Sequence, residues 1–158
     1  MKRQFGQFFT TNSDYILQGM ERFVRNKEIT DPFAGNQDLI KWSRKNNCKK
    51  AVGFDYDKKY VDSNIVFYND SINLPKKYRF ICTNPPYLHK NKADKKTKEI
   101  FFRNNNSIFE DLYQISIASL MNCDEGILIV PLNFLSAENS KKIRSLFFKK
   151  FEIVRLNI

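Results

Sequence analysis

Short apolar runs alternate with helical patterns along this chain, and this alternation limits the possible fold more than any other feature. Most runs have the length of a strand, and the stretches between them carry apolar residues that recur every three to four positions. Such an order is typical of an α/β protein with a mostly parallel, doubly wound sheet. Six strands are predicted, at Glu28 to Phe33, Ala51 to Tyr56, Asn64 to Tyr68, Tyr78 to Thr83, Gly126 to Pro131 and Glu152 to Ile158.

The predicted helices have N-cap residues or apolar faces that support them. The first begins near Asn12 or Ser13, and its apolar face is formed by Ile16, Leu17, Met20, Phe23 and Val24. The others fill Gln37 to Asn46, Ser107 to Asn122, and Ala137 to Lys150 after a Ser136 cap.

Length and composition predict one domain with a sizeable core. The chain has 158 residues, of which 42% are hydrophobic. No apolar run approaches the roughly 20 residues of a membrane span, and the N-terminus lacks the apolar stretch of a signal peptide. We therefore expect a cytoplasmic protein with no membrane partner. Cys48, Cys82 and Cys123 form no CxxC pair and are accompanied by a single histidine, His89, so we interpret them as structural thiols and predict no metal site.

Acidic residues follow the predicted strands at their carboxyl ends, where doubly wound sheets bind ligands. The first strand leads into DPFAGN at 31–36, an acid followed by a tight turn into a helix. Gly35 in that turn lets the backbone approach a ligand without a Cβ in the way. Aspartate and glycine are ordinary loop residues, but acidic ends on three successive strands are a much stronger signal.

The second and third strand ends have the groups that a nucleoside needs. The second strand ends in GFDYD at 53–57, where a carboxylate can accept both hydroxyls of a ribose. Phe54 or Tyr56 can stack on a purine beside it. After the third strand, Asp70 can accept a hydrogen bond from an adenine amino group.

The fourth predicted strand ends in Asn84-Pro85-Pro86-Tyr87. This turn presents an amide, two prolines of fixed φ and an aromatic ring at the end of a strand. The combination suits the binding of a flat base that carries an amino group. We interpret it as a catalytic loop, and the alternative is a rigid surface turn.

The net charge of +10 is concentrated after this turn. The stretch 88–106 contains Lys90, Lys92, Lys95, Lys96, Lys98 and Arg103, against Asp94 and Glu99. One interpretation is a solvated surface loop. Because the stretch directly follows the predicted catalytic loop, we favour a flexible arm that follows nucleic-acid phosphates.

Five segments share their order and spacing with a known family: QFGQFFTT at 4–11, DPFAGNQDL at 31–39, GFDYD at 53–57, NDSI at 69–72 and TNPPY at 83–87. The chain resembles the S-adenosylmethionine-dependent amino-group DNA methyltransferases, specifically the N6-adenine type with an NPPY loop. The resemblance implies a Rossmann-like methyltransferase fold, S-adenosylmethionine as cofactor, S-adenosylhomocysteine as product, and methylation of adenine N6 in DNA within a restriction-modification system. The implied cofactor-binding residues are Phe9, Thr10, Asp31, Phe33, Ala34, Gly35, Asp55, Tyr56, Asp70 and Asn84.

The resemblance also assigns roles to the NPPY residues. The Asn84 side-chain oxygen and the Pro85 carbonyl would accept the two amino hydrogens of adenine, and Pro85 and Pro86 would hold that carbonyl in place. Tyr87 would stack on the face of the base. In duplex DNA the target base would have to be flipped out of the stack.

Gln37 departs from the family pattern, because it stands where the motif has its second glycine. A side chain there is expected to loosen cofactor binding or to alter the turn.

Other functions stay open. An RNA adenine methyltransferase or a protein-glutamine methyltransferase could use the same loop, and a related domain could serve as a non-catalytic cofactor-binding or assembly subunit of a split enzyme. A cytosine C5 enzyme is disfavoured, because Cys82 precedes Thr83 within a predicted strand instead of following a proline. An N4-cytosine enzyme more often has serine in place of Asn84.

The end of the chain suggests an incomplete enzyme. In the family, a seventh strand follows the sixth and inserts beside it, and a target recognition domain reads the DNA sequence. Neither is found within residues 1–158, so we expect the catalytic domain alone, as the N-terminal part of a longer enzyme or as one chain of a split enzyme. In a split enzyme, the expected partner is a C-terminal chain or subunit that carries both parts.

Overall fold

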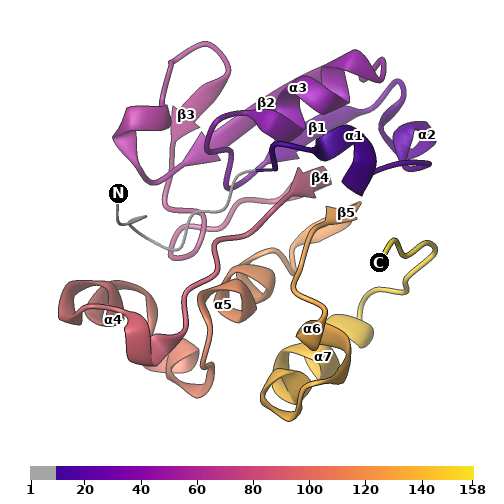
Figure 1. Cartoon of the computed structure of the whole chain (residues 1–158). Coiled ribbons are helices and arrows are strands. Elements are labelled where there is room, and N and C mark those ends of the chain that lie inside the picture. The colour runs from indigo at the N-terminus through magenta and orange to yellow at the C-terminus, as the bar shows by residue number, and fades with distance from the viewer. Residues whose placement is uncertain (1–9) are drawn as a thin grey trace.

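The computed structural model describes residues 10–158 (Figure 1). Within them, a five-stranded sheet has the order β3-β2-β1-β4-β5 and every pairing is parallel. The strands are β1 (Glu28–Asp31), β2 (Lys50–Asp55), β3 (Val66–Tyr68), β4 (Tyr78–Thr83) and β5 (Cys123–Leu128). The prediction of an α/β fold with a doubly wound parallel sheet is therefore confirmed. The strand order reverses between β1 and β4, which places a topological switch point at their carboxyl ends.

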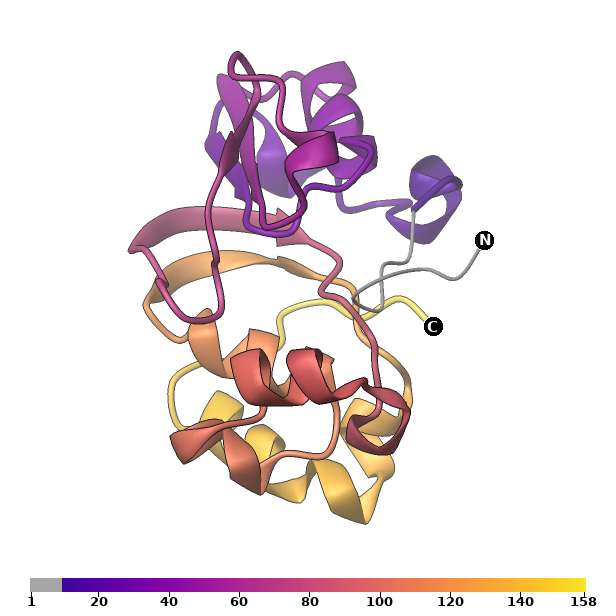
Figure 2. The same ribbon diagram turned by 90° about the vertical axis from the view of Figure 1, so that its left-hand side faces the viewer.

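Helices cover both faces of this sheet (Figures 1 and 2). On one face lie α1 (Ser13–Ile16), α2 (Glu21–Val24) and α3 (Asp38–Lys45). On the other lie α4 (Lys95–Phe101), α5 (Leu112–Ser119), α6 (Asn133–Ser136) and α7 (Lys141–Phe148). Short 3₁₀ turns lie in the connections between helices and strands: η2 (Lys58–Tyr60), η3 (Lys90–Lys92), η4 (Asn104–Ile108) and η5 (Glu138–Ser140).

The central strand β4 shows why these runs are apolar on both faces. Phe80 and Cys82 point into the core beneath α1 to α3, whereas Ile81 packs with Leu120 on the opposite face. A strand covered on both sides must be apolar at nearly every position. Burial also raises the pKa of the Cys82 thiol, which agrees with its interpretation as core.

Three predicted helices differ from the structure for local reasons. The first is divided into α1 and α2, because Gly19 between them adopts a φ of +79° that no helix continues through. Instead of Ser107, α5 begins at Leu112, where the Asp111 side chain caps it and the Gln114 side chain accepts from the Asp111 backbone. The helix predicted at Ala137 to Lys150 retains only α7 as α-helix, and Ser136, its predicted cap, is instead the last residue of α6.

The basic stretch after the NPPY turn is not the flexible arm or loop that the sequence predicts. It contains α4, whose Asp94 cap accepts from the Thr97 backbone at 2.7 Å. Thr97 and Phe101, four residues apart on one helix face, are both buried. Lys95, Lys96 and Lys98 therefore lie on a helix that packs against the core, and Lys90 and Lys92 lie in the preceding 3₁₀ turn η3.

The predicted sixth strand at Glu152 to Ile158 is also wrong, because this segment is irregular. Side chains hold it instead: Asn157 donates to the carbonyls of Ile16 and Gln18, at 3.0 Å each. Residues of this segment, of β5 and of α1 line an apolar groove. Among the described residues, no helix is long and apolar enough to cross a bilayer.

Candidate active site

A pocket opens at the carboxyl ends of β1 to β4. Its empty volume is about 770 Å³ including the open mouth, within the usual range for small-molecule sites. It is lined by ten of the residues predicted from sequence: Thr10, Asp31, Phe33, Ala34, Gly35, Asp55, Tyr56, Asp70, Asn84 and Pro86. Pro85 and Tyr87 are not part of its lining. Phe9 lies outside the described residues.

Asp31 joins the ends of β1 and β4 at the base of the pocket. Its carboxylate accepts from the Thr83 hydroxyl at 2.6 Å and from the Phe33 backbone at 3.1 Å. The residue is 2% exposed. Burial raises its pKa to about 7, because the hydrogen bonds from Thr83 and Phe33 do not fully offset the loss of water and Asp55 adds a like charge.

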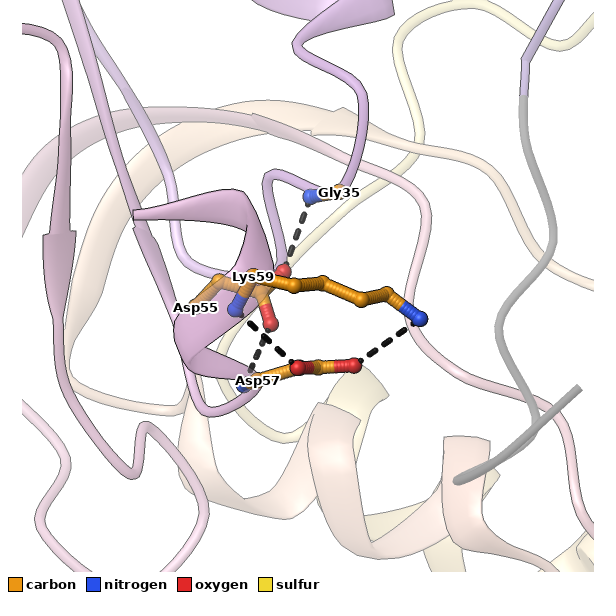
Figure 3. A network of polar contacts seen from close by, with 4 residues as sticks. All are labelled: Gly35, Asp55, Asp57 and Lys59. Atoms are coloured by element: carbon orange, nitrogen blue, oxygen red, sulfur yellow. Dashed lines mark hydrogen bonds and ion pairs between the residues drawn. The ribbon is translucent and has the colours of Figure 1, made fainter. Parts of the chain in front are cut away.

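Asp55 holds the turn between β1 and α3 to the end of β2 (Figure 3). One carboxylate oxygen accepts from the Gly35 backbone at 2.8 Å, and the other accepts from the Asp57 backbone at 2.8 Å. Burial raises its pKa. Asp55, which is predicted to bind the ribose hydroxyls, thus also shapes the pocket. Each of its carboxylate oxygens keeps a further lone pair that can accept a hydrogen bond.

Asp57, the second carboxylate of the GFDYD segment, was not among the predicted cofactor-binding residues, but it also lines the pocket. Its carboxylate accepts from the Lys59 backbone and forms an ion pair with Lys59 Nζ at 3.0 Å (Figure 3). The alternation of side chains in extended backbone was the available signal, because residues two apart, such as Asp55 and Asp57, lie on the same side.

The turn itself packs closely against β2. A Cβ on Gly53 would lie 2.5 Å from the Ala34 Cβ and 2.8 Å from Ile40 Cδ1, so glycine is required for this approach. Gln37 adopts the left-handed conformation that the family's glycine would favour, with φ 67°. Its side chain donates to Asp62 at 2.8 Å and is not part of the pocket lining. The Gln37 side chain is thus bonded outside the pocket lining, and its expected effect on cofactor binding stays a prediction.

The remaining wall is largely apolar. The Tyr56 ring meets the Phe101 ring edge-on, with centroids 5.5 Å apart. Ile72 and Leu112 complete this side. Asp70 lies near them and uses its oxygens to accept from the Asn73 backbone and side chain, at 3.0 and 2.8 Å. No motif pointed to Phe101 or Leu112, because they reach the pocket only through the packing of α4 and α5.

The NPPY turn brings its amide, and not its ring, to the pocket. Asn84 Nδ2 donates to Thr10 Oγ1 at 3.1 Å, and the Tyr87 hydroxyl donates to Asn84 Oδ1. The Tyr87 hydroxyl also lies 2.8 Å from the Ile129 carbonyl. Its ring packs edge-on against Tyr113 with centroids 6.0 Å apart. The expected stacking of the Tyr87 ring on a base stays a prediction.

Comparison with known proteins agrees with this arrangement. No curated protein is significantly similar to the chain. The model of one family, described as Eco57I restriction-modification methylase, matches residues 7–157. This range includes the whole sheet and every pocket residue named above. The chain therefore belongs to the Eco57I restriction-modification methylase family.

Proposed function

We propose that this chain is an S-adenosylmethionine-dependent DNA methyltransferase that modifies N6 of adenine within a restriction-modification system. One observation carries the proposal: the amide of Asn84 lines the same pocket as the carboxylates of Asp31, Asp55 and Asp70. An acceptor suited to an amino group thus lies beside groups suited to a nucleoside. Membership of the methylase family supports a methyl-transfer chemistry.

The pocket residues fit the proposed cofactor by their chemistry. Tyr56, Ile72 and Phe101 offer an apolar wall for a purine ring, and Asp70 is an acceptor beside it. Asp55 and Asp57 are suited to ribose hydroxyls, and Asp31 carries a carboxylate near the NPPY end. When bound, S-adenosylmethionine supplies a methyl group on a positively charged sulfur, which acidic surroundings favour.

The NPPY residues suit the adenine amino group because they can accept hydrogen bonds from its two hydrogens. The adenine amine is a poor nucleophile because its lone pair is delocalised into the ring. Acceptors that bind both amino hydrogens draw the nitrogen toward tetrahedral geometry, and Asn84 Oδ1 and the Pro85 carbonyl are suited to this role. Fixed φ angles at Pro85 and Pro86 hold the carbonyl without further ordering cost.

We also propose that the exposed face of η3 and α4 contacts DNA phosphates. Lys92, Lys95 and Lys96 are exposed there, whereas Phe101 on the opposite face of α4 lines the pocket. A duplex whose flipped base entered the pocket would bring its backbone near this helix. Lysines on a fixed surface position a backbone without reading its sequence.

A partner that carries the sequence-reading part of the enzyme stays a prediction. What supports it is the apolar groove along β5, whose outer edge pairs with no other described strand. An unpaired edge offers backbone hydrogen bonds to a further strand. Activity should therefore be assayed with and without a candidate partner chain.

The decisive experiment offers labelled S-adenosylmethionine to the chain and separates DNA, RNA and protein acceptors. Label in adenine N6 of DNA is expected. Asn84→Ala should abolish this label while leaving calorimetric affinity for S-adenosylhomocysteine nearly intact, because the amide acts on the base. Label in RNA or protein instead of DNA would mean that the chain methylates that acceptor, and would contradict the proposed substrate. Cofactor binding without transfer to any acceptor would indicate an assembly subunit.

A further inference from the structure

The turn between β1 and α3 is tied at two places to the segment 55–62, which begins at the end of β2. Within the turn, the Gly35 backbone donates to the Asp55 carboxylate at 2.8 Å (Figure 3). Two residues later, Gln37 Nε2 donates to Asp62 Oδ2 at 2.8 Å. Residues 33–36 of the turn and residues 55–57 of the other segment line the pocket. The two hydrogen bonds therefore join two walls of the pocket.

The acceptor of the Gln37 side chain is itself held in place. Asp62 Oδ1 accepts from the backbones of Asn64, Ile65 and Val66, at 3.0, 2.7 and 2.9 Å. Hydrogen bonds, above all from the backbones of Val66 and Ile65, hold the pKa of Asp62 at about 2, so its carboxylate is ionised at any ordinary pH. Val66 is the first residue of β3 and is fully buried. Asp62 is thus anchored to the sheet.

The backbone of Gln37 both closes the turn and begins the helix. Its N–H donates to the Ala34 carbonyl at 2.8 Å, and its carbonyl accepts from the Lys41 backbone at 2.9 Å. Its φ of 67° lies in the left-handed region, where glycine is most easily accommodated. Glutamine is less favourable there, but it makes a side-chain hydrogen bond that glycine lacks.

We infer that Gln37 is a positioning residue that holds the two walls of the cofactor pocket together through Asp62. The inference rests on the proposed role of this pocket in binding S-adenosylmethionine. Without the bond, the walls can move apart and the pocket has its binding shape for less of the time, which weakens the apparent affinity. The family pattern predicts looser binding from a side chain at this position, whereas this contact predicts tighter binding.

Gln37→Glu tests the contact because it keeps the size of the side chain and places a second carboxylate against Asp62. Calorimetry should show a Kd for S-adenosylhomocysteine that is about three-fold to ten-fold higher than in the wild type. Gln37→Gly should raise the Kd by a similar factor, although it restores the glycine of the family pattern. An unchanged Kd in Gln37→Glu, or tighter binding in Gln37→Gly, would overturn the inference.

Asp62→Asn provides the matched rescue. The new amide oxygen can keep the three backbone hydrogen bonds, and its NH₂ group can donate to the side chain at position 37. Asp62→Asn alone should bind nearly as the wild type does, because the Gln37 amide can turn over and accept. Combined with Gln37→Glu, it should restore the wild-type Kd. A double variant as weak as Gln37→Glu would refute the pairing, since a purely structural effect at position 37 would not be reversed from position 62.

A second readout needs no ligand. In NMR hydrogen exchange, the Gly35 amide should exchange several-fold faster in Gln37→Glu and return to the wild-type rate in the double variant. The Ile129 amide, which donates to the Thr83 carbonyl at 3.0 Å between β4 and β5, is the control and should not change. Unchanged exchange at Gly35 would overturn the inference. A wild-type chain that binds no S-adenosylhomocysteine would instead refute the proposed cofactor, and the exchange at Gly35 then decides whether Gln37 joins the two walls.

Discussion

Among single residues, Asp31 places a carboxyl group at the base of the pocket, where burial disfavours its charged form. The side chain is buried and bonded to Thr83 and Phe33, so it connects two strand ends. Its pKa of about 7 means that the folded protein keeps its proton at a pH where an unfolded chain has lost it. A nearby cationic ligand would favour the ionised form.

This raised pKa predicts how stability changes with pH. Between about pH 4 and pH 7 the folded state binds more protons at Asp31 than the unfolded state does. The free energy of unfolding should therefore fall as pH rises through this window and level off above it. Asp31→Asn keeps an oxygen that accepts from Thr83 and Phe33, so urea unfolding at pH 5 and pH 8 should show a smaller fall in the variant.

The fall should shrink without vanishing, because burial also raises the pKa of Asp55 and Asp111 in the same direction. Asp124→Asn, at an exposed position, removes the same charge and serves as control. Parallel stability curves for Asp31→Asn and the wild type would contradict the assignment.

Among the elements, α4 differs most from its predicted form. Its seven residues were expected to belong to a loop or flexible arm, because lysines dominate their composition. The Asp94 cap, the buried Thr97 and Phe101, and a contact of 3.3 Å from the Asn73 side chain to the Ile100 carbonyl fix it instead. A fixed helix presents its charges with less loss of freedom on binding.

The lysines of this region carry a testable salt dependence. Replacing Lys92 and Lys96 together by glutamine should weaken DNA binding and reduce the slope of log K against log salt by about two, since each phosphate contact contributes about 0.9. Titrations at several salt concentrations measure this slope.

A matched control removes the same charge elsewhere. Lys45 forms an ion pair with Asp14, and Lys49 forms one with Glu28. Both pairs lie near the end of α3 and the start of β1, at the opposite end of the sheet from the pocket. Their double replacement by glutamine should leave the slope nearly unchanged. An equal reduction of the slope in both double variants would mean that the net charge of the chain, and not the surface of η3 and α4, accounts for DNA binding.

At the scale of the whole molecule, the pocket joins the two layers that cover the sheet. Gly35 and Asp38 reach it from the β1–α3 side, while Phe101 and Leu112 reach it from α4 and α5. A ligand bound there contacts both layers at once. Its binding should therefore stabilise the fold as a whole.

This coupling gives a simple test of the cofactor proposal. At a concentration of S-adenosylhomocysteine 100 times its Kd, the free energy of unfolding should rise by about 2.7 kcal/mol. For a domain of this size that corresponds to a rise in Tm of roughly 5–10 °C. Thermal unfolding with adenosine as a weaker control ligand measures the shift. No change in Tm at millimolar S-adenosylhomocysteine would exclude the pocket as its site.

Local patterns were enough to predict β1 to β4 and the positions of the acids that follow them. Apolar runs at the β1, β2, β3 and β4 positions predicted the sheet, and the rule that ligands bind at carboxyl strand ends brought Asp31, Asp55, Asp70 and Asn84 to one pocket. Residues of that kind need only their own strand to be placed correctly.

Other features could not be predicted, because they depend on partners that are far away in the chain and become neighbours only on folding. Glu152 to Ile158 has the pattern of a strand, but Asn157 bonds to carbonyls of the α1 region instead. The Tyr87 hydroxyl donates to Asn84 and its ring packs edge-on against Tyr113, and the NPPY pattern indicates neither contact. A local pattern states what a side chain is able to do, and the neighbours that folding brings to it select which of these roles it takes.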